Sequence, residues 1–191
     1  GFGFLGLDTT LGNADASDNR NEYLTQEEIE GELKQAFGLK RVLWVDSGSL
    51  SGDDTDSHID ILARFCDPET IAYLKSDNPK DPDYESLMNM EAQLQSFRTL
   101  DGKPYRLVPL PKPEQMFLDD YPLPASYANF LIINGAVLVP GSGSELDEVA
   151  RTRLQEVFPD REVIVIDCRP LLSGHGGLHC VTMQFPEGWL E

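Results

Sequence analysis

Cationic side chains are scarce in this sequence of 191 residues, since 15 Lys and Arg stand against 33 Asp and Glu and give a formal net charge of −18. Proteins that grip a nucleic-acid backbone need a basic surface, so the charge balance argues against a nucleic-acid partner. A small cationic molecule would instead be attracted to such a protein. We therefore favour a positively charged small substrate.

Cysteine is also rare. The three cysteines, Cys66, Cys168 and Cys180, are odd in number and show no Cys-x-x-Cys spacing, so neither a disulfide framework nor a zinc ribbon is indicated. The longest apolar run, Phe130 to Pro140, is too short to span a bilayer. No basic segment followed by an apolar one opens the chain. We expect a cytoplasmic protein without membrane association.

Two short segments carry most of the reactive side chains. One is Gly174-His-Gly-Gly-Leu-His-Cys-Val-Thr-Met-Gln184, in which a glycine-rich turn leads to Cys180. Such a turn lets the backbone come close to a ligand, and a thiol at the point where it enters a strand is exposed without being mobile. The other segment, Gly52 to Asp60, holds four carboxylates and His58. These carboxylates would repel one another unless a cation lies among them, either a metal ion or a substrate.

For Cys180 two interpretations compete. A free cysteine is most often a small buried hydrophobic residue, whereas a histidine within reach activates a thiol as a nucleophile. Gly176 and Gly177 would leave room for a planar group beside the sulfur. Cys66, within a predicted strand, and Cys168, just after one, are assigned to the core.

His58 and Asp60 are two residues apart. At the start of an extended segment such residues point the same way, so both would face one pocket, with His58 moving protons and Asp60 binding a cation. A solvated acidic turn is the simpler alternative. A metal site is a third alternative, and its candidate ligands are Asp53, Asp54, Asp56, His58, Asp60, His175, His179 and Cys180. The EF-hand pattern is absent and glycines separate His175 from His179, so we expect no metal.

The expected secondary structure contains a repeat. Helices are predicted to begin near residues 25, 83 and 144, and around each the order is two strands, helix, strand. Equivalent loops, Asp46 to Asp60 and Asp167 to Cys180, follow the third strand of a unit. If the units surround an axis, these loops converge and His58 meets Cys180.

Several boundaries follow from local signals. Thr25 to Glu28 is a capping box and Gly38 ends its helix, while Asn134-Gly135 predicts a type I′ hairpin. Further predictions are at most one strand before Asn21, near Phe2 to Leu7; a helix starting at Asp81-Pro82; a Pro-rich loop from Pro109 to Pro124; a helix capped by Ser144; and a last strand from Val181 to Phe185.

Four ordered motifs resemble a known family. They are Gly52-Asp-Asp-Thr-Asp-Ser-His-Ile-Asp60 with Ala63-Arg-Phe65, Ser126-Tyr-Ala-Asn-Phe-Leu-Ile-Ile-Asn-Gly-Ala-Val-Leu-Val-Pro140, Phe158-Pro-Asp-Arg-Glu162 and His179-Cys-Val-Thr-Met-Gln184. Together they resemble the bacterial agmatine deiminase and peptidyl-arginine deiminase family. The resemblance implies an α+β fold, the pentein propeller of five ββαβ units around a pseudo-fivefold axis, and places the reaction in putrescine biosynthesis.

The resemblance also implies a chemistry. Cys180 would attack the guanidinium carbon of agmatine or an arginine-like compound, His58 would protonate the departing ammonia, and water activated by His58 would release a ureido product from a covalent amidino-thioether. Asp60 would be both catalytic and substrate-binding, and Asp54 and Gly177 would contact the substrate. No cofactor or metal is implied. Amidine transfer to an amine and a non-catalytic pentein-like module remain as alternatives.

Length sets this sequence apart from the family, whose chains are roughly twice as long. Its Arg-Asp-x-Gly-Pro and Glu-Gly-Gly motifs do not occur here, and Ser57 and His175 stand where glycine is common. We expect residues 1–191 to form the C-terminal part of one pentein domain, with about three of the five units. The missing N-terminal part or a second copy of the chain would then be a partner.

Overall fold

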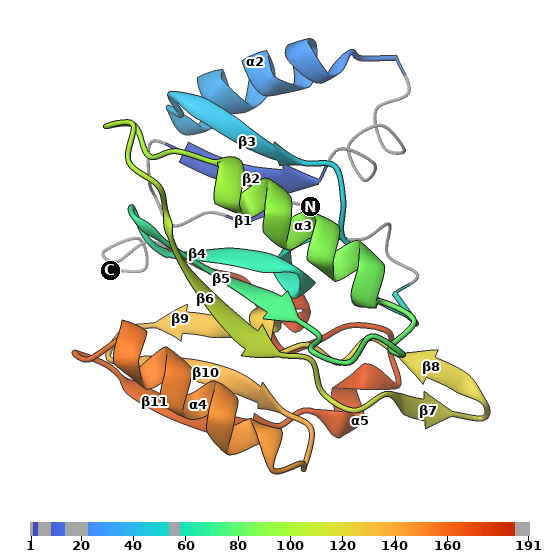
Figure 1. Cartoon of the computed structure of the whole chain (residues 1–191). Coiled ribbons are helices and arrows are strands. Elements are labelled where there is room, and N and C mark those ends of the chain that lie inside the picture. Colours follow the sequence, from blue (N-terminus) through green and yellow to red (C-terminus); the bar gives the residue numbers. More distant parts are fainter. Residues whose placement is uncertain (1, 4–8, 14–22, 54–57, 186–191) are drawn as a thin grey trace.

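The computed structural model describes residues 2–3, 9–13, 23–53 and 58–185, and three units of one topology follow one another in it (Figure 1). In each unit two antiparallel strands are followed by a helix and by a third strand parallel to the second. The predicted repeat is confirmed.

The elements of the three units have the following bounds. The first unit contains β1 (Phe2–Gly3), β2 (Thr9–Asn13), α2 (Gln26–Phe37) and β3 (Arg41–Val45). The second contains β4 (Ala63–Asp67), β5 (Thr70–Lys75), α3 (Tyr84–Ser96) and β6 (Arg106–Pro111). The third contains β9 (Leu131–Ile133), β10 (Ala136–Gly141), α4 (Leu146–Val157) and β11 (Glu162–Asp167). In the three-stranded sheet of each unit the second strand is central.

Local signals explain where the first helix begins and ends. The Thr25 side chain accepts a hydrogen bond from the Glu28 amide, and the Glu28 carboxylate accepts one from the Thr25 amide, so the capping box is present. Gly38 follows the helix with φ of 66°, the left-handed conformation that glycine adopts at little cost. The predicted start and stop of this helix are both confirmed.

A short 3-10 turn follows the third strand of every unit, after a loop. These turns are η1 (Ile59–Ile61), η2 (Tyr127–Asn129) and η3 (His179–Val181). Because η1 and η2 each lead into the first strand of the next unit, the three turns occupy equivalent places in the repeat. Two loops of this kind were expected from the sequence, and the structure adds the one that ends in η2.

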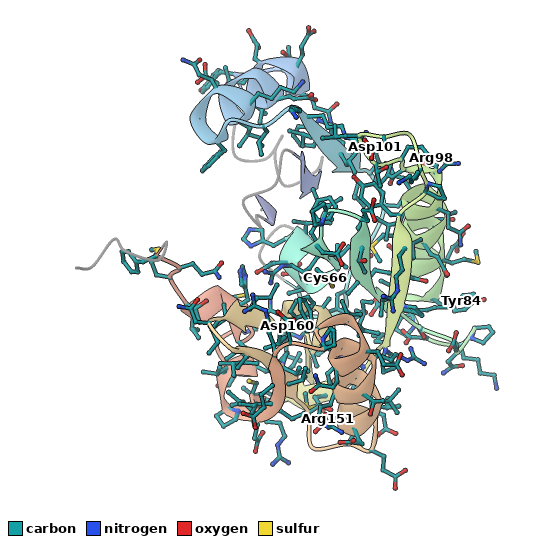
Figure 2. All side chains as sticks on the ribbon, turned by 90° about the vertical axis from the view of Figure 1, so that its left-hand side faces the viewer. Cys66, Tyr84, Arg98, Asp101, Arg151 and Asp160 are labelled. Atoms are coloured by element: carbon teal, nitrogen blue, oxygen red, sulfur yellow. The ribbon has the colours of Figure 1, made fainter. Side chains whose placement is uncertain are left out.

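The three units share one hydrophobic core. A single cluster of buried side chains includes Leu11 and Val45 of the first unit, Leu62 of the second and Phe130 of the third. The helices lie on the outer side of the sheets, where Figure 2 shows Tyr84 and Arg151, whereas Cys66 on β4 lies within the arc formed by the units. The turns η1 and η2 are buried against this core. Within the described residues no helix is long and apolar enough to cross a membrane.

Several predicted elements differ in the structure. A second strand, β2, precedes the first helix, where no more than one strand was expected. Residues 182–185 are not a strand, because the chain tightens into η3 at Cys180. The predicted Pro-rich loop contains the hairpin of β7 (Met116–Leu118) and β8 (Tyr121–Leu123), and the short helix α5 (Arg169–Leu172) precedes the glycine-rich segment.

The turn and cap predictions also need correction. A type I′ turn requires positive φ at both central residues. Asp119 and Asp120, between β7 and β8, have φ of 49° and 66°, whereas at the Asn134-Gly135 hairpin only Gly135 is positive. Helix α3 begins at Tyr84 rather than at Pro82. The Asp81 carbonyl oxygen accepts the Tyr84 amide, which closes a separate turn before the helix. Glu145 occupies the N-cap position of helix α4 without a side-chain hydrogen bond, and the predicted capping contact is made by Ser144, whose Oγ atom accepts the Leu146 amide at 3.1 Å.

Candidate active site

The turns η1, η2 and η3 bring three side chains together, one from each unit boundary. Asp60 lies on η1, Asn129 on η2 and Cys180 on η3. The Cys180 Sγ atom is 3.7 Å from Asp60 Oδ2 and 3.5 Å from Asn129 Nδ2. Residues that are 120 positions apart in the chain thus form one cluster, and the repeat explains why: equivalent turns converge.

Asn129 holds the three turns to one another. Its side-chain amide donates to Asp60 Oδ2 at 3.1 Å, and its carbonyl oxygen accepts the His179 amide at 2.8 Å. The residue is 1% exposed. Because the donor and the acceptor of this buried amide are both used, the amide fixes the positions of the groups that it contacts. Asn129 therefore sets the separation of the carboxylate and the thiol.

His179 is the second partner of the Asp60 carboxylate. Its Nδ1 atom lies 2.7 Å from Asp60 Oδ2. That oxygen thus contacts both His179 and Asn129, while the other oxygen, Oδ1, is buried and has no hydrogen-bond partner among the described residues. A buried carboxylate oxygen without a donor is costly. This oxygen of Asp60 is therefore open to a donor that the described residues do not supply.

The electrostatics favour an ionised Asp60. Burial raises the pKa of its carboxyl group, but the hydrogen bond from His179 and the positive charges of His179, Arg64 and His58 together outweigh burial, so the net shift is downward. Arg64 is 2% exposed and its guanidinium donates to the Phe130 carbonyl oxygen at 2.8 Å. A fixed negative charge thus lies beside Cys180.

Burial raises the pKa of the Cys180 thiol, and the negative charge of Asp60 raises it further. Although Cys180 as a residue is exposed, its sulfur is close enough to Asp60 and Asn129 to lose part of its hydration. Cys66 and Cys168 are buried, and burial raises the pKa of Cys66 to about 12. Both lie in the core, as the sequence predicted.

His58 immediately precedes η1, and its charge acts on the Asp60 carboxylate. The pair was predicted on an extended segment. The prediction was wrong for Asp60, because only His58 has extended backbone angles and Ile59 to Ile61 form a 3-10 turn. The role of His58 as a proton carrier stays a prediction. Asp54, the other carboxylate predicted to bind substrate, lies outside the described residues.

The two glycines before Cys180 serve different neighbours. A Cβ atom on Gly177 would lie 2.2 Å from Asn129 Oδ1, so this glycine makes room for the buried amide. A Cβ atom on Gly176 would lie 3.3 Å from the Cys180 Cβ atom and 4.0 Å from its sulfur. Gly177 was predicted to contact the substrate; the structure gives it a contact with Asn129.

Two residues of the site were not assigned a role from the sequence. Asn129 was quoted only within a motif, and His179 only within a motif and as a candidate metal ligand. The repeat could have pointed to them. Asn129 lies on η2 and His179 on η3, and these turns are equivalent to η1, which carries Asp60. Among the described residues no group of three or more His, Cys, Asp and Glu side chains is placed to hold a metal ion.

Comparison with known proteins identifies the family. Residues 8–186 match the family of Porphyromonas-type peptidyl-arginine deiminases. The chain belongs to this family. A putative agmatine deiminase of Legionella pneumophila is 34% identical over 172 residues, which are 90% of this chain and 49% of that protein.

Solved structures of relatives agree with this membership. The putative arginine deiminase of Porphyromonas gingivalis is 52% identical with a TM-score of 0.94, and the match covers 98% of this chain and 56% of that one. A Cys-to-Ser variant of the agmatine deiminase of C. jejuni, with substrate bound, is 36% identical with a TM-score of 0.87 over 93% of this chain and 52% of that one. The fold is therefore part of a pentein domain. The chain spans about half the length of the curated relatives it matches.

Proposed function

We propose that this chain carries the nucleophile and one substrate-binding carboxylate of an enzyme that hydrolyses a guanidino group, in agmatine or an arginine-like compound, to a ureido group and ammonia. The observation that carries the proposal is the contact of 3.7 Å between Cys180 Sγ and Asp60 Oδ2, together with the buried Asp60 Oδ1 atom, which has no hydrogen-bond partner in the part of the chain that the structure describes. Membership of the deiminase family supports it.

A guanidinium group suits the unpaired oxygen of Asp60. It is planar, cationic and rich in N–H donors, and a carboxylate is its natural partner. A donor on Asp60 Oδ1 would place the guanidinium carbon beside the Cys180 sulfur, which lies at the same carboxylate. The positive charge would also offset the effect of Asp60 on the thiol, so that substrate binding favours the thiolate.

The covalent steps then balance as follows. His58 takes the thiol proton, and the Cys180 sulfur adds its electron pair to the guanidinium carbon, which forms a C–S bond. His58 returns the proton to one NH₂ group, the C–N bond breaks and ammonia leaves. Water, losing a proton to His58, adds to the carbon of the amidino-thioether. The C–S bond breaks, His58 returns this proton to the departing sulfur, and the new hydroxyl group loses its proton to solvent, so that the thiol and the ureido product are set free.

The test is product analysis with matched variants. The protein is incubated with agmatine, free arginine and an arginine peptide, and ammonia and ureido product are measured together. Equal amounts of both, abolished in Cys180→Ser and kept in Cys66→Ser, would support the proposal. Amidine transfer to an added amine without ammonia, or wild-type turnover by Cys180→Ser, would overturn it.

A further inference from the structure

A buried lysine lies away from the proposed catalytic cluster. The Lys112 side chain, just after β6, is 5% exposed, and its Nζ atom lies 2.6 Å from Asp81 Oδ1 and 2.7 Å from Asp83 Oδ2. Both carboxylates precede helix α3 and are themselves shielded from solvent, at 14% and 7% side-chain exposure. A charged group this deeply buried persists only when it is paired.

The same carboxylate of Asp83 reaches into the preceding unit. It accepts the Ser51 amide at 3.0 Å and the Ser51 hydroxyl at 2.6 Å. Ser51 belongs to the loop that follows β3 and leads to His58. Lys112 and Asp83 therefore tie the loop of the first unit to the start of the helix in the second.

The backbone of this loop is fixed at two further points. Gly52 has φ of 90°, and a Cβ atom there would lie 2.1 Å from the Pro122 carbonyl oxygen on β8. The Asp53 amide donates to the Leu50 carbonyl oxygen at 3.0 Å, which closes a turn, and Leu50 is 5% exposed. The turn Leu50–Asp53 is thus held by the hydrogen bonds to Asp83 and lies in close contact with the β7–β8 hairpin.

A carboxylate plays the corresponding part at the next unit boundary. Asp147, in the first turn of α4, accepts the Tyr127 hydroxyl at 2.6 Å, and Tyr127 lies on η2, which carries Asn129. In both cases a carboxylate near a helix start holds the loop of the unit before it. Only the first boundary adds a buried lysine, because there the carboxylates come in a pair that needs a counter-charge.

From these contacts we propose that Lys112 and Asp83 are positioning residues for the active site: they hold the turn Leu50–Asp53 and thereby help to place His58, which directly precedes the turn η1 that carries Asp60. The inference rests on the proposed function for the role of His58, but the holding of the turn is independent of it. Without Lys112, two buried carboxylates face each other uncompensated, and the Ser51 contacts weaken. The core beneath Cys180 uses other residues and keeps its structure.

The experiment compares Lys112→Met with Lys80→Met, an exposed lysine nearby, in two measurements. The first is hydrogen exchange at the Ser51 and Asp53 amides, with α4 as internal reference. We expect exchange about tenfold faster or more at these amides in Lys112→Met, with α4 unchanged, and no change in Lys80→Met. Unchanged exchange, or an equal rise throughout the chain, would overturn the proposal.

The second measurement is the labelling of Cys180 by a cationic haloacetamidine and by neutral iodoacetamide. Lys112→Met should slow labelling by both reagents about tenfold, because the proposed proton acceptor His58 serves either reaction, while the preference for the cationic reagent, which Asp60 provides, is kept. Faster exchange with unchanged rates of labelling would show that the anchor does not reach the site, and the proposal would fall. Should Lys112→Met not fold, Ser51→Ala, which removes only the 2.6 Å contact, must show the same changes at smaller size.

The wild-type protein separates this inference from the function on which it rests. If Cys180 of the wild-type protein reacts no faster with the cationic reagent than with the neutral one, this result counts against the proposed function. The exchange measurement would still decide whether Lys112 holds the turn.

Discussion

Asn129 donates its side-chain amide to Asp60 although 69 residues separate them, and this contact of 3.1 Å joins two equivalent turns of the repeat. The same amide lies 3.5 Å from Cys180 Sγ on the third such turn. The site is thus a product of the pseudo-symmetry: each unit boundary contributes one side chain to it.

Replacing Asn129 by Ala should weaken both the site and the fold. The change removes the side-chain hydrogen bonds of Asn129 to Asp60 and to the His179 amide. We therefore expect a loss of about 1–3 kcal/mol in the free energy of unfolding and much slower labelling of Cys180 by a haloacetamidine. Urea unfolding and mass spectrometry measure the two effects. Asn134→Ala, at an exposed turn, is the control, and equal behaviour of the two variants would contradict the role of Asn129.

Asp60→Asn should change the two labelling reactions of Cys180 in opposite directions. The negative charge of Asp60 raises the pKa of the thiol, so its removal should lower that pKa and shift the pH profile of alkylation by iodoacetamide to lower pH. Labelling by a cationic amidine should slow, because its carboxylate partner is gone. Asp101→Asn, a change at an exposed loop residue, should alter neither. A pH profile that stays in place would argue against the electrostatic coupling of the two groups.

Gly177→Ala should inactivate the site while Gly174→Ala leaves it intact. A Cβ atom on Gly177 would overlap Asn129 Oδ1, whereas on Gly174 the nearest atom is the Leu171 carbonyl oxygen at 3.4 Å. Asn129 is buried and cannot move away, so the η3 turn must shift. Rates of Cys180 alkylation and thermal unfolding curves of both variants test this. Equal rates in the two variants would show that the glycine is not needed for packing.

Tyr127→Phe should destabilise the protein near neutral pH and less at acid pH. Burial and the Asp147 carboxylate raise the pKa of Tyr127 to about 12, so its hydroxyl remains a donor. Burial raises the pKa of Asp147, but its hydrogen bonds from Tyr127, Ser142 and Gly143 lower it more. The stabilisation by ionised Asp147 is present above the ordinary carboxyl pKa and is lost as the pH falls through the lowered value.

The expected loss on Tyr127→Phe is about 1–2 kcal/mol at pH 7, measured by denaturant unfolding across a pH series. The difference between the variant and the wild type should shrink below the ordinary carboxyl pKa. A difference that is constant with pH would mean that Asp147 is not the partner that matters.

The sequence predicted the repeat and two of the three residues in the cluster. Helix caps such as Thr25 and Gly38, and the alternation of strands and helices, are local signals, and they carry the ββαβ order. Cys180 and Asp60 were chosen because a histidine within reach activates a thiol and because a carboxylate two residues from a histidine can bind a cation. Placing equivalent loops around an axis predicted that His58 meets Cys180, whereas the residue found 3.7 Å from the Cys180 sulfur is Asp60.

The remaining features depend on contacts that no local pattern reveals. Asn129 resembles any polar residue before a strand until its amide is seen between Asp60 and the His179 backbone. Residues 182–185 have strand-like composition, yet η3 precedes them and they form no strand. Lys112 follows a proline-rich strand, and its burial against the carboxylates of Asp81 and Asp83 is visible only in the structure.

The most direct test of the central claim is the intact mass of the protein after incubation with a haloacetamidine, with Cys180→Ala and Asp60→Asn measured alongside. A single adduct on the wild type, mapped to Cys180, absent from Cys180→Ala and strongly slowed in Asp60→Asn, is the predicted result. An adduct that forms equally fast in Asp60→Asn, or that maps to Cys66 or Cys168, would contradict the account of Cys180 and Asp60 as one guanidinium site.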